Sequence, residues 1–320
     1  MAKTPGSPLS IAEPAAGAAE RPHRFSHEAM ATVFEVLVHG QEAEYAQQAA
    51  WAAFDEVDRI EADLSRFRPG SDISRINAAQ AGTLHRVSLS TFECLQAAAR
   101  IHAETGGAFD VTVGSLLALW RPGEGGGVAA PSHAELAAAR ARTAMDLVYL
   151  SPTEPAVGLK ADGVRVDLGG IGKGFAVDRM MEVLGDWSIA AALAHGGLST
   201  VRAIGCPPGK PGWRVVLGDP EAETGDLGAV HLKDASFSGS SIVHKRHIID
   251  PRSGRPVEGR LGTWVRCESA AVCDALSTAF TVMSVEEVRE YCGQHPNVSA
   301  MLAVRDSGGR KDLRFGKWGA

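Results

Sequence analysis

A glycine-rich stretch at 164–178, VRVDLGGIGKGFAVD, holds the first residues whose types and spacing point to chemistry. Its glycines surround Lys173 and precede a segment with the apolar spacing of a helix. A loop without side chains exposes backbone N–H groups, and the positive end of the next helix dipole favours an anion such as phosphate. The dinucleotide fingerprint needs glycine where Phe175 stands, and the P-loop needs Ser or Thr where Gly174 stands. Phosphate binding and a purely structural turn both stay open for this stretch.

Asp274 and Thr278 lie one helical turn apart in a predicted helix at 269–283. A carboxylate and a hydroxyl at this spacing offer two hard oxygens to one small cation, and Mg²⁺ prefers such ligands. In the alternative interpretation, Thr278 donates to a backbone carbonyl and Asp274 is solvated. The spacing alone does not choose between a metal site and a polar helix face.

Three other polar residues are candidates with equally plain structural alternatives. His247 precedes a β-branched pair, which is typical of a strand-end histidine as well as of a catalytic base. Asp110 follows two glycines and either caps the next turn or accepts a ligand N–H, and His195 before two glycines is a weaker candidate of the same kind. The chain contains neither G-x-S-x-G nor H-E-x-x-H, which disfavours α/β-hydrolase and metalloprotease chemistry.

The elements that must position these residues alternate between strands and helices without a repeat or a clear linker. We therefore expect an α+β fold, a single mixed domain with antiparallel or mixed sheets and packed helices, at 25–320 after a disordered tail at 1–24. The apolar patterns predict strands at 31–38, 164–168, 190–194, 213–217, 229–232 and 299–304, and a hairpin at 146–150 and 156–159. They predict helices at 42–64, 90–105, 131–142, 175–184, 269–283 and 285–292.

Composition sets limits on the class of protein. The 320 residues are 45% apolar and 22% charged, as in a soluble globular chain, and the net charge of −6 argues against a nucleic-acid surface. Five cysteines without C-x-x-C spacing indicate free thiols in a reducing compartment. We see no signal peptide, no lipoprotein signal and no run of 18 apolar residues, so we expect a cytoplasmic protein without a membrane span.

Eight short motifs, taken in order, resemble the ApbE family, the FAD:protein FMN transferases. They span residues 30 to about 283 and are specific in combination rather than singly. The motifs are MAT at 30–32, LSRF at 64–67, TGGAFDVTV at 105–113, VDLGGIGKG at 166–174 with Asp178, HGG at 195–197, SG at 238–239, HIIDP at 247–251 and DALST at 274–278.

The resemblance implies an enzyme that binds FAD with its pyrophosphate bridged by Mg²⁺. Members of the family pass the FMN half to a threonine or serine hydroxyl of an acceptor flavoprotein and release AMP, and some hydrolyse FAD to FMN and AMP instead. By motif position, the implied metal ligands are the Gly170 carbonyl, Asp274 and Thr278, with Ser277 nearby. The implied flavin and adenine contacts are Met30, Phe67, Ala108, Phe109, Asp110, Asp167, Lys173 and Ile248.

The chemistry of this transfer assigns two catalytic roles, as expectations, to three candidate residues. Phosphoryl-group transfer depends on positioning and on neutralising charge at the phosphate oxygens, and Lys173 would supply a cation. The acceptor hydroxyl needs a proton acceptor, for which we favour His247 over Asp274. Two alternatives stay open: an FAD pyrophosphatase that uses water, and a non-catalytic FAD-binding or carrier protein.

Overall fold

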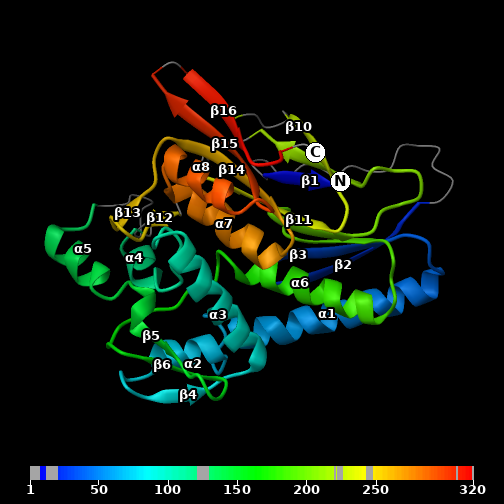
Figure 1. The fold of residues 1–320 in the computed structure, drawn as a ribbon. Helices are drawn as coiled ribbons and strands as arrows, with labels where there is room; N and C mark the ends of the chain where they lie inside the picture. Colours follow the sequence, from blue (N-terminus) through cyan, green and yellow to red (C-terminus); the bar gives the residue numbers. More distant parts are fainter. Residues whose placement is uncertain are drawn as a thin grey trace.

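An eight-stranded sheet runs through the centre of the protein, with the strand order β16-β15-β14-β11-β8-β7-β3-β2 (Figure 1). The computed structural model describes residues 8–11, 21–120, 130–219, 221, 226–242, 248–307 and 309–318. Each neighbouring pair in this sheet is antiparallel. The strands are β2 His23–Ala29, β3 Thr32–Val38, β7 Ala192–Gly196, β8 Thr200–Ile204, β11 Ala235–Ser241, β14 Arg260–Cys267, β15 Ser299–Asp306 and β16 Gly309–Phe315.

Helices cover one face of this sheet and enclose the larger hydrophobic core with it. Figure 1 shows α1 and α6 lying along this face, and α6 packs in turn against α7. The predicted α+β architecture is confirmed. The helices are α1 Ala43–Leu64, α2 Asp72–Ala78, α3 Leu89–Glu104, α4 Gly114–Leu119, α5 His133–Arg140, α6 Gly172–Asp186, α7 Ala270–Val282 and α8 Val285–Gln294.

Helix α1 shows how the sequence produces this layer. Its buried residues recur every three or four positions, so that they form one apolar stripe along the helix. Four of them are alanines, and their small side chains let the helix lie close to the strands and to α6. The stripe consists of Ala46, Ala49, Ala50, Ala53, Phe54, Val57, Ile60 and Leu64.

A second, smaller sheet covers the opposite face of the large sheet. It has the order β1-β9-β10, formed by Leu9–Ile11, Trp213–Gly218 and Asp226–Leu232. Leu9 is buried in the core between the two sheets, and the Trp264 indole N–H donates to the Pro8 carbonyl at 3.0 Å. Five residues of the predicted disordered tail are therefore in paired strands, Leu9–Ile11 in β1 and His23 with Arg24 at the start of β2, while residues 1–7 and 12–20 lie outside the described part of the chain.

Two small sheets complete the fold beside the helices. The order β4-β6-β5 joins Leu84–Arg86, Ala156–Leu159 and Val148–Leu150, which follows a 3₁₀ turn at Met145–Leu147. The pairing of β5 with β6 confirms the predicted hairpin. The other sheet is the pair β12 and β13, Ile249–Asp250 with Arg255–Pro256.

The predicted strand at 164–168 does not form, apart from a single parallel bridge between Arg165 and Val113. The side-chain amide of Asn77 on α2 takes the place of a neighbouring strand. It donates to the Val166 carbonyl at 2.9 Å and accepts from the Val166 N–H at 2.7 Å. Asp167 N–H donates to the Val111 carbonyl at 2.7 Å, so the segment is extended and its backbone is satisfied without a ladder.

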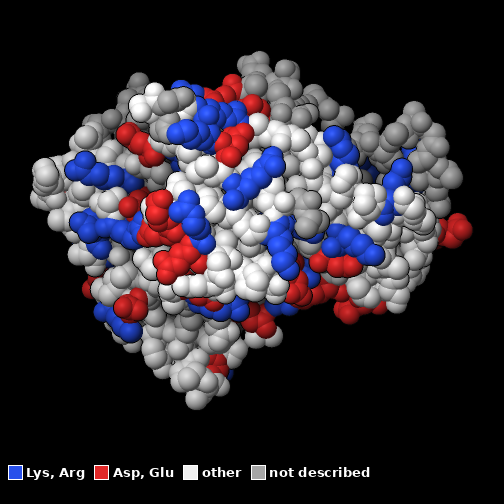
Figure 2. Space-filling view, turned by 45° about the horizontal axis from the view of Figure 1, so that its top comes forward, with Lys and Arg blue, Asp and Glu red and all other residues white. Residues whose placement is uncertain are grey.

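Charged side chains of both signs are spread over the molecular surface. On the face drawn in Figure 2, Lys and Arg side chains alternate with Asp and Glu side chains across the described residues. Within the described part of the chain, none of the helices combines the length and the apolar character needed to cross a bilayer.

A buried ion-pair network lies in β2, β3 and β7. Glu35 accepts hydrogen bonds from Arg24 at 2.6 Å and pairs with His195 Nε2 at 2.6 Å, and both Glu35 and His195 are only 2% exposed. Burial alone would raise the pKa of Glu35, but hydrogen bonds and charge interactions with His195 and Arg24 outweigh it and lower its pKa to about 2. His195 therefore connects β7 to β3 through its hydrogen bond with Glu35.

Replacing Asn77 tests whether its amide substitutes for a strand. Asn77→Ala leaves the Val166 N–H and carbonyl without their partners, so the free energy of unfolding should fall by roughly 2–3 kcal/mol in urea titrations. Gln48→Ala, at an exposed position of α1, is the control and should change it by less than about 0.5 kcal/mol. Equal effects of the two substitutions would contradict the assignment.

The Glu35 network makes the free energy of unfolding depend on pH. Because the folded pKa of about 2 lies below the ordinary value of 4.5, the stabilisation is complete above pH 4.5 and is lost as the pH falls through 2. Between these limits the parent should lose about 3 kcal/mol more unfolding free energy than Glu35→Gln. Urea unfolding followed by circular dichroism at a series of pH values measures this, and parallel pH profiles would refute it.

Candidate functional site

The glycine-rich turn before α6 lies directly against α7. A methyl group added at Gly170 would lie 3.3 Å from Thr278 Oγ1 and 3.2 Å from the Phe109 ring. These three residues come from parts of the chain that are more than 60 positions apart. The predicted juxtaposition of the Gly170 loop with the Asp274 and Thr278 turn is therefore present in the fold.

Asp274 and Thr278 lie on the side of α7 that faces this turn. Asp274 is 4% exposed, and its Oδ2 accepts the Gly174 N–H at 3.1 Å. The Thr278 hydroxyl donates to the Asp274 carbonyl at 3.4 Å, as the structural alternative predicted. That bond uses the hydroxyl proton and leaves the oxygen lone pairs able to accept or to coordinate. Asp274 is buried rather than solvated, which removes the other half of that alternative.

Lys173 brings a cation to the same place. Its ammonium donates to the Gly169 carbonyl at 3.3 Å and lies 3.8 Å from Asp274 Oδ2. Three of the neighbouring backbone N–H groups are used within the protein: Gly169 donates to Asp167, Gly172 to the Leu168 carbonyl, and Gly174 to Asp274. The turn therefore offers a cation and backbone carbonyls, and part of the N–H cradle that the glycine pattern favoured is already used by the protein.

The donor set around Gly170 fits a hard divalent cation. It combines one buried carboxylate, one hydroxyl oxygen and one backbone carbonyl, which are the oxygen ligands that Mg²⁺ takes while keeping water or substrate phosphate on its other positions. Among the described residues, no group of three or more His, Cys, Asp or Glu side chains is placed so that it could hold a metal ion by itself. Because this set has a single carboxylate, it suits an ion whose remaining coordination positions are filled by substrate phosphates.

Ser277 forms two hydrogen bonds within the protein. It is fully buried, its hydroxyl donates to the Asp274 carbonyl at 2.9 Å, and it shares a 2.7 Å hydrogen bond with Ser240 on β11. These contacts tie α7 to the sheet. Of the four residues predicted at the metal, Ser277 is the one whose side chain bonds to a strand of the large sheet.

Asp167, Arg66 and Phe67 form a connected unit beside the glycine turn. Arg66 pairs with Asp167 at 3.1 Å, and its guanidinium lies 4.4 Å from the centre of the Phe67 ring. Phe67 is 74% exposed, so this contact holds an aromatic side chain at the surface. The sequence analysis gave contact roles to Phe67 and Asp167 and placed Arg66 in the LSRF motif without a role, and the structure shows that Arg66 connects the two.

Asp110 is occupied by interactions within the protein. One oxygen accepts from the Thr112 N–H at 2.7 Å and hydroxyl at 2.5 Å, and the other accepts from Met145 N–H at 3.1 Å. His102 lies 3.2 Å from Asp110, and this hydrogen bond raises the pKa of His102 despite its partial burial. The carboxylate fixes the turn that presents Ala108 and Phe109, both of which are buried.

The remaining candidates lie in three separate segments. Met30 is in the β2–β3 turn with a positive φ of 49° and packs against the main core. Ile248 is buried, and its carbonyl accepts the Val257 N–H at 3.1 Å. His247, the predicted proton acceptor, lies outside the described residues.

Two bacterial proteins illustrate the similarity of this chain to known sequences. The FAD:protein FMN transferase of Salmonella typhimurium is 29% identical over 276 residues, which cover 82% of this chain and 78% of that protein. The FAD:protein FMN transferase of Haemophilus influenzae is 30% identical over 268 residues, covering 78% of this chain and 76% of that protein. The aligned regions are most of the chain in both cases.

Solved structures show the same architecture. The flavin transferase ApbE from Vibrio cholerae superposes with a TM-score of 0.81 at 24% identity, over 92% of this chain and 97% of that one. The apbe protein of Thermotoga maritima superposes with a TM-score of 0.82 at 27% identity, with the same coverage. The model of the ApbE family matches residues 30–302. With the motifs in place and the fold shared, this chain belongs to the ApbE family.

Proposed function

We propose that this chain transfers the FMN half of FAD to a threonine or serine hydroxyl of an acceptor protein, in a reaction that requires Mg²⁺ and releases AMP. The family membership and the names of the relatives support FMN transfer from FAD to protein. One observation of geometry carries the finer proposal, namely the contact of the Gly170 turn with Thr278 and the buried Asp274.

In the proposed reaction, the acceptor oxygen attacks the phosphorus of the FMN half. The bond from this phosphorus to the bridging pyrophosphate oxygen breaks, and AMP leaves with that oxygen. Mg²⁺ bound by the Gly170 carbonyl, Asp274 and Thr278 would neutralise charge on the pyrophosphate oxygens. Lys173, 3.8 Å from Asp274, adds a second positive charge at the same place.

The other predicted site residues have binding and proton-transfer roles in the proposal. Phe67, supported by Arg66, offers an exposed aromatic face to a flavin or adenine ring. Met30 and Ile248 supply apolar contacts, Asp167 lies beside the turn, and Asp110 orients the Ala108–Phe109 turn from behind. His247 takes the proton of the acceptor hydroxyl, with Asp274 as the alternative acceptor.

Removing the Asp274 carboxylate tests the metal assignment. Asp274→Ala should lower flavin transfer by at least about 100-fold, because the only carboxylate of the donor set is lost. Incubation with FAD, Mg²⁺ and an acceptor domain, followed by mass spectrometry, measures the FMN added to the acceptor. Asp55→Ala, at an exposed position of α1, is the matched control and should transfer as the parent does.

The same incubation separates the alternatives. Release of AMP and free FMN without acceptor would indicate an FAD pyrophosphatase, and recovery of intact FAD bound to the protein would indicate a carrier. Transfer by Asp274→Ala at the parent rate, with an unchanged melting temperature, would refute the proposed metal site.

A methyl group at Gly170 tests the contact itself. Gly170→Ala would crowd Thr278 Oγ1 and the Phe109 ring, so one of them must shift by a few tenths of an ångström. We expect the Mg²⁺ concentration for half-maximal transfer to rise by about 10-fold, because changes that move metal ligands typically weaken metal affinity by this factor or more.

Gly185→Ala is the control for this experiment, because the new methyl group on α6 would meet no atom within 4 Å. It should leave the Mg²⁺ dependence unchanged and raise helix stability by about 0.5–1 kcal/mol. An unchanged Mg²⁺ dependence in Gly170→Ala would contradict the proposed role of the turn.

A further inference from the structure

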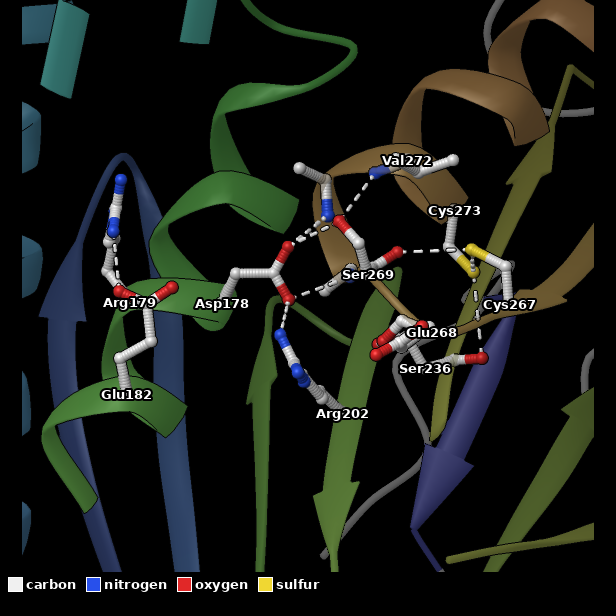
Figure 3. Close-up of polar contacts among 12 residues, drawn as sticks. Asp178, Arg179, Glu182, Arg202, Ser236, Cys267, Glu268, Ser269, Val272 and Cys273 are labelled. Atoms are coloured by element: carbon white, nitrogen blue, oxygen red, sulfur yellow. Dashed lines mark hydrogen bonds and ion pairs between the residues drawn. The ribbon is translucent and has the colours of Figure 1, made fainter. Parts of the chain in front are cut away.

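Asp178 is a buried carboxylate on α6 that points at the first turn of α7 (Figure 3). Its Oδ1 accepts the Ala270 N–H at 2.8 Å, and its Oδ2 accepts the Ala271 N–H at 2.9 Å and the Ser269 hydroxyl at 2.7 Å. Arg202 of β8 pairs with the same carboxylate. Both oxygens of Asp178 are thus committed to contacts within the protein.

These bonds give α7 an unusual start. An α-helix leaves its first N–H groups without partners in the helix, and they are normally satisfied by the residue before it. Ser269 fills that role only for Val272, whose N–H it accepts at 3.2 Å. The N–H groups of Ala270 and Ala271 are satisfied by a carboxylate from another helix, whose charge also favours the positive end of the α7 dipole.

Asp274 makes the reverse contact from α7 to α6. Its carboxylate accepts the Gly174 N–H in the first turn of α6 at 3.1 Å. Asp178 follows Gly174 by four residues, and Asp274 follows Ala270 by four residues. A side chain on Gly174 would collide with the Ala270 carbonyl, so the two helices touch at this crossing. Each helix therefore accepts backbone N–H groups from the first turn of the other helix. The accepting carboxylate lies one turn after the point where the helix itself is bound.

We infer that Asp178 is a positioning residue for the candidate magnesium site. It fixes the start of α7 against α6, and this sets where the Asp274 carboxylate and the Thr278 hydroxyl lie relative to the Gly170 turn. The inference rests on the proposed function for its metal, but the contact between the helices exists without it. Asp178 itself has no oxygen left to coordinate an ion.

The substitution Asp178→Asn keeps the shape of the side chain and removes its charge. The new NH₂ group faces N–H donors where a carboxylate oxygen accepted them, so at least one hydrogen bond to α7 is lost. We expect faster amide exchange at the start of α7 and a half-saturating Mg²⁺ concentration raised by about 10-fold. The rate of transfer at saturating Mg²⁺ should stay within about 2-fold of the parent, because bound metal restores the geometry.

Two measurements on the full chain test this. Hydrogen–deuterium exchange without metal compares peptides covering 268–276 and 170–176 with the rest of the chain. FAD binding without acceptor, followed by flavin fluorescence at increasing Mg²⁺, gives the half-saturating concentration without relying on catalysis. Transfer to an acceptor at saturating Mg²⁺ then gives the rate.

Arg179→Ala is the matched control on the same helix. Arg179 pairs with Glu93 and Glu182, and among the described residues no hydrogen bond or ion pair joins its side chain to α7. It should change neither exchange at 268–276 nor the Mg²⁺ dependence. If Asp178→Asn does not fold, Ser269→Ala replaces it, since this change removes one bond to Asp178 and the cap of Val272.

The outcomes separate this inference from the proposed function. Unchanged exchange at 268–276, or unchanged Mg²⁺ dependence of FAD binding, in the substituted protein overturns the positioning role. Loss of rate at saturating Mg²⁺ with an unchanged half-saturating concentration also overturns it. A parent that binds FAD with Mg²⁺ but modifies no acceptor refutes the proposed transfer and leaves the positioning role supported by exchange and binding.

Discussion

The crossing of α6 and α7 is the contact on which the candidate site depends. Gly174 lets the two backbones touch, and no other residue type fits there because a Cβ would collide with the Ala270 carbonyl. Two carboxylates, Asp178 and Asp274, then use the free N–H groups at the two helix starts. Buried backbone donors and buried carboxylates satisfy one another, so the crossing is specific as well as close.

The layers around this crossing explain why it is held in place. Helix α7 lies against β11 and β14, and the hydroxyls of Ser277 and Thr281 bond to Ser240 and Thr263 on these strands at 2.7 and 3.1 Å. Helix α6 lies between α1 and α7 over the same sheet. On the far face, the β1-β9-β10 sheet closes a second core. The site residues thus come from loops and helix starts that a rigid, two-sided sheet supports.

Polar residues near the site divide into two groups by what their atoms already contact. Asp110 and Asp178 have their oxygens committed to protein donors, so they shape turns and helix ends. Lys173 brings a cation and Thr278 brings oxygen lone pairs to the neighbourhood of Gly170. Phe67 has an aromatic face at the surface. The distinction matters because motif residues of both groups occur in the same short stretches of sequence, such as Lys173 and Asp178.

Local pattern alone determined much of this protein. Apolar spacing located α1, α6 and α7 to within a few residues, since a helix that packs on a sheet must carry a continuous apolar stripe. The ordered motifs also identified the family. Three features were decided only by the tertiary structure. Asn77 replaces a strand beside Val166, Leu9 pairs with β9 in the smaller sheet, and Asp178 binds the start of α7. Each of these depends on a hydrogen-bond partner 89 to 208 residues away along the chain, and such a partner is set by packing of the whole fold rather than by its neighbours in sequence.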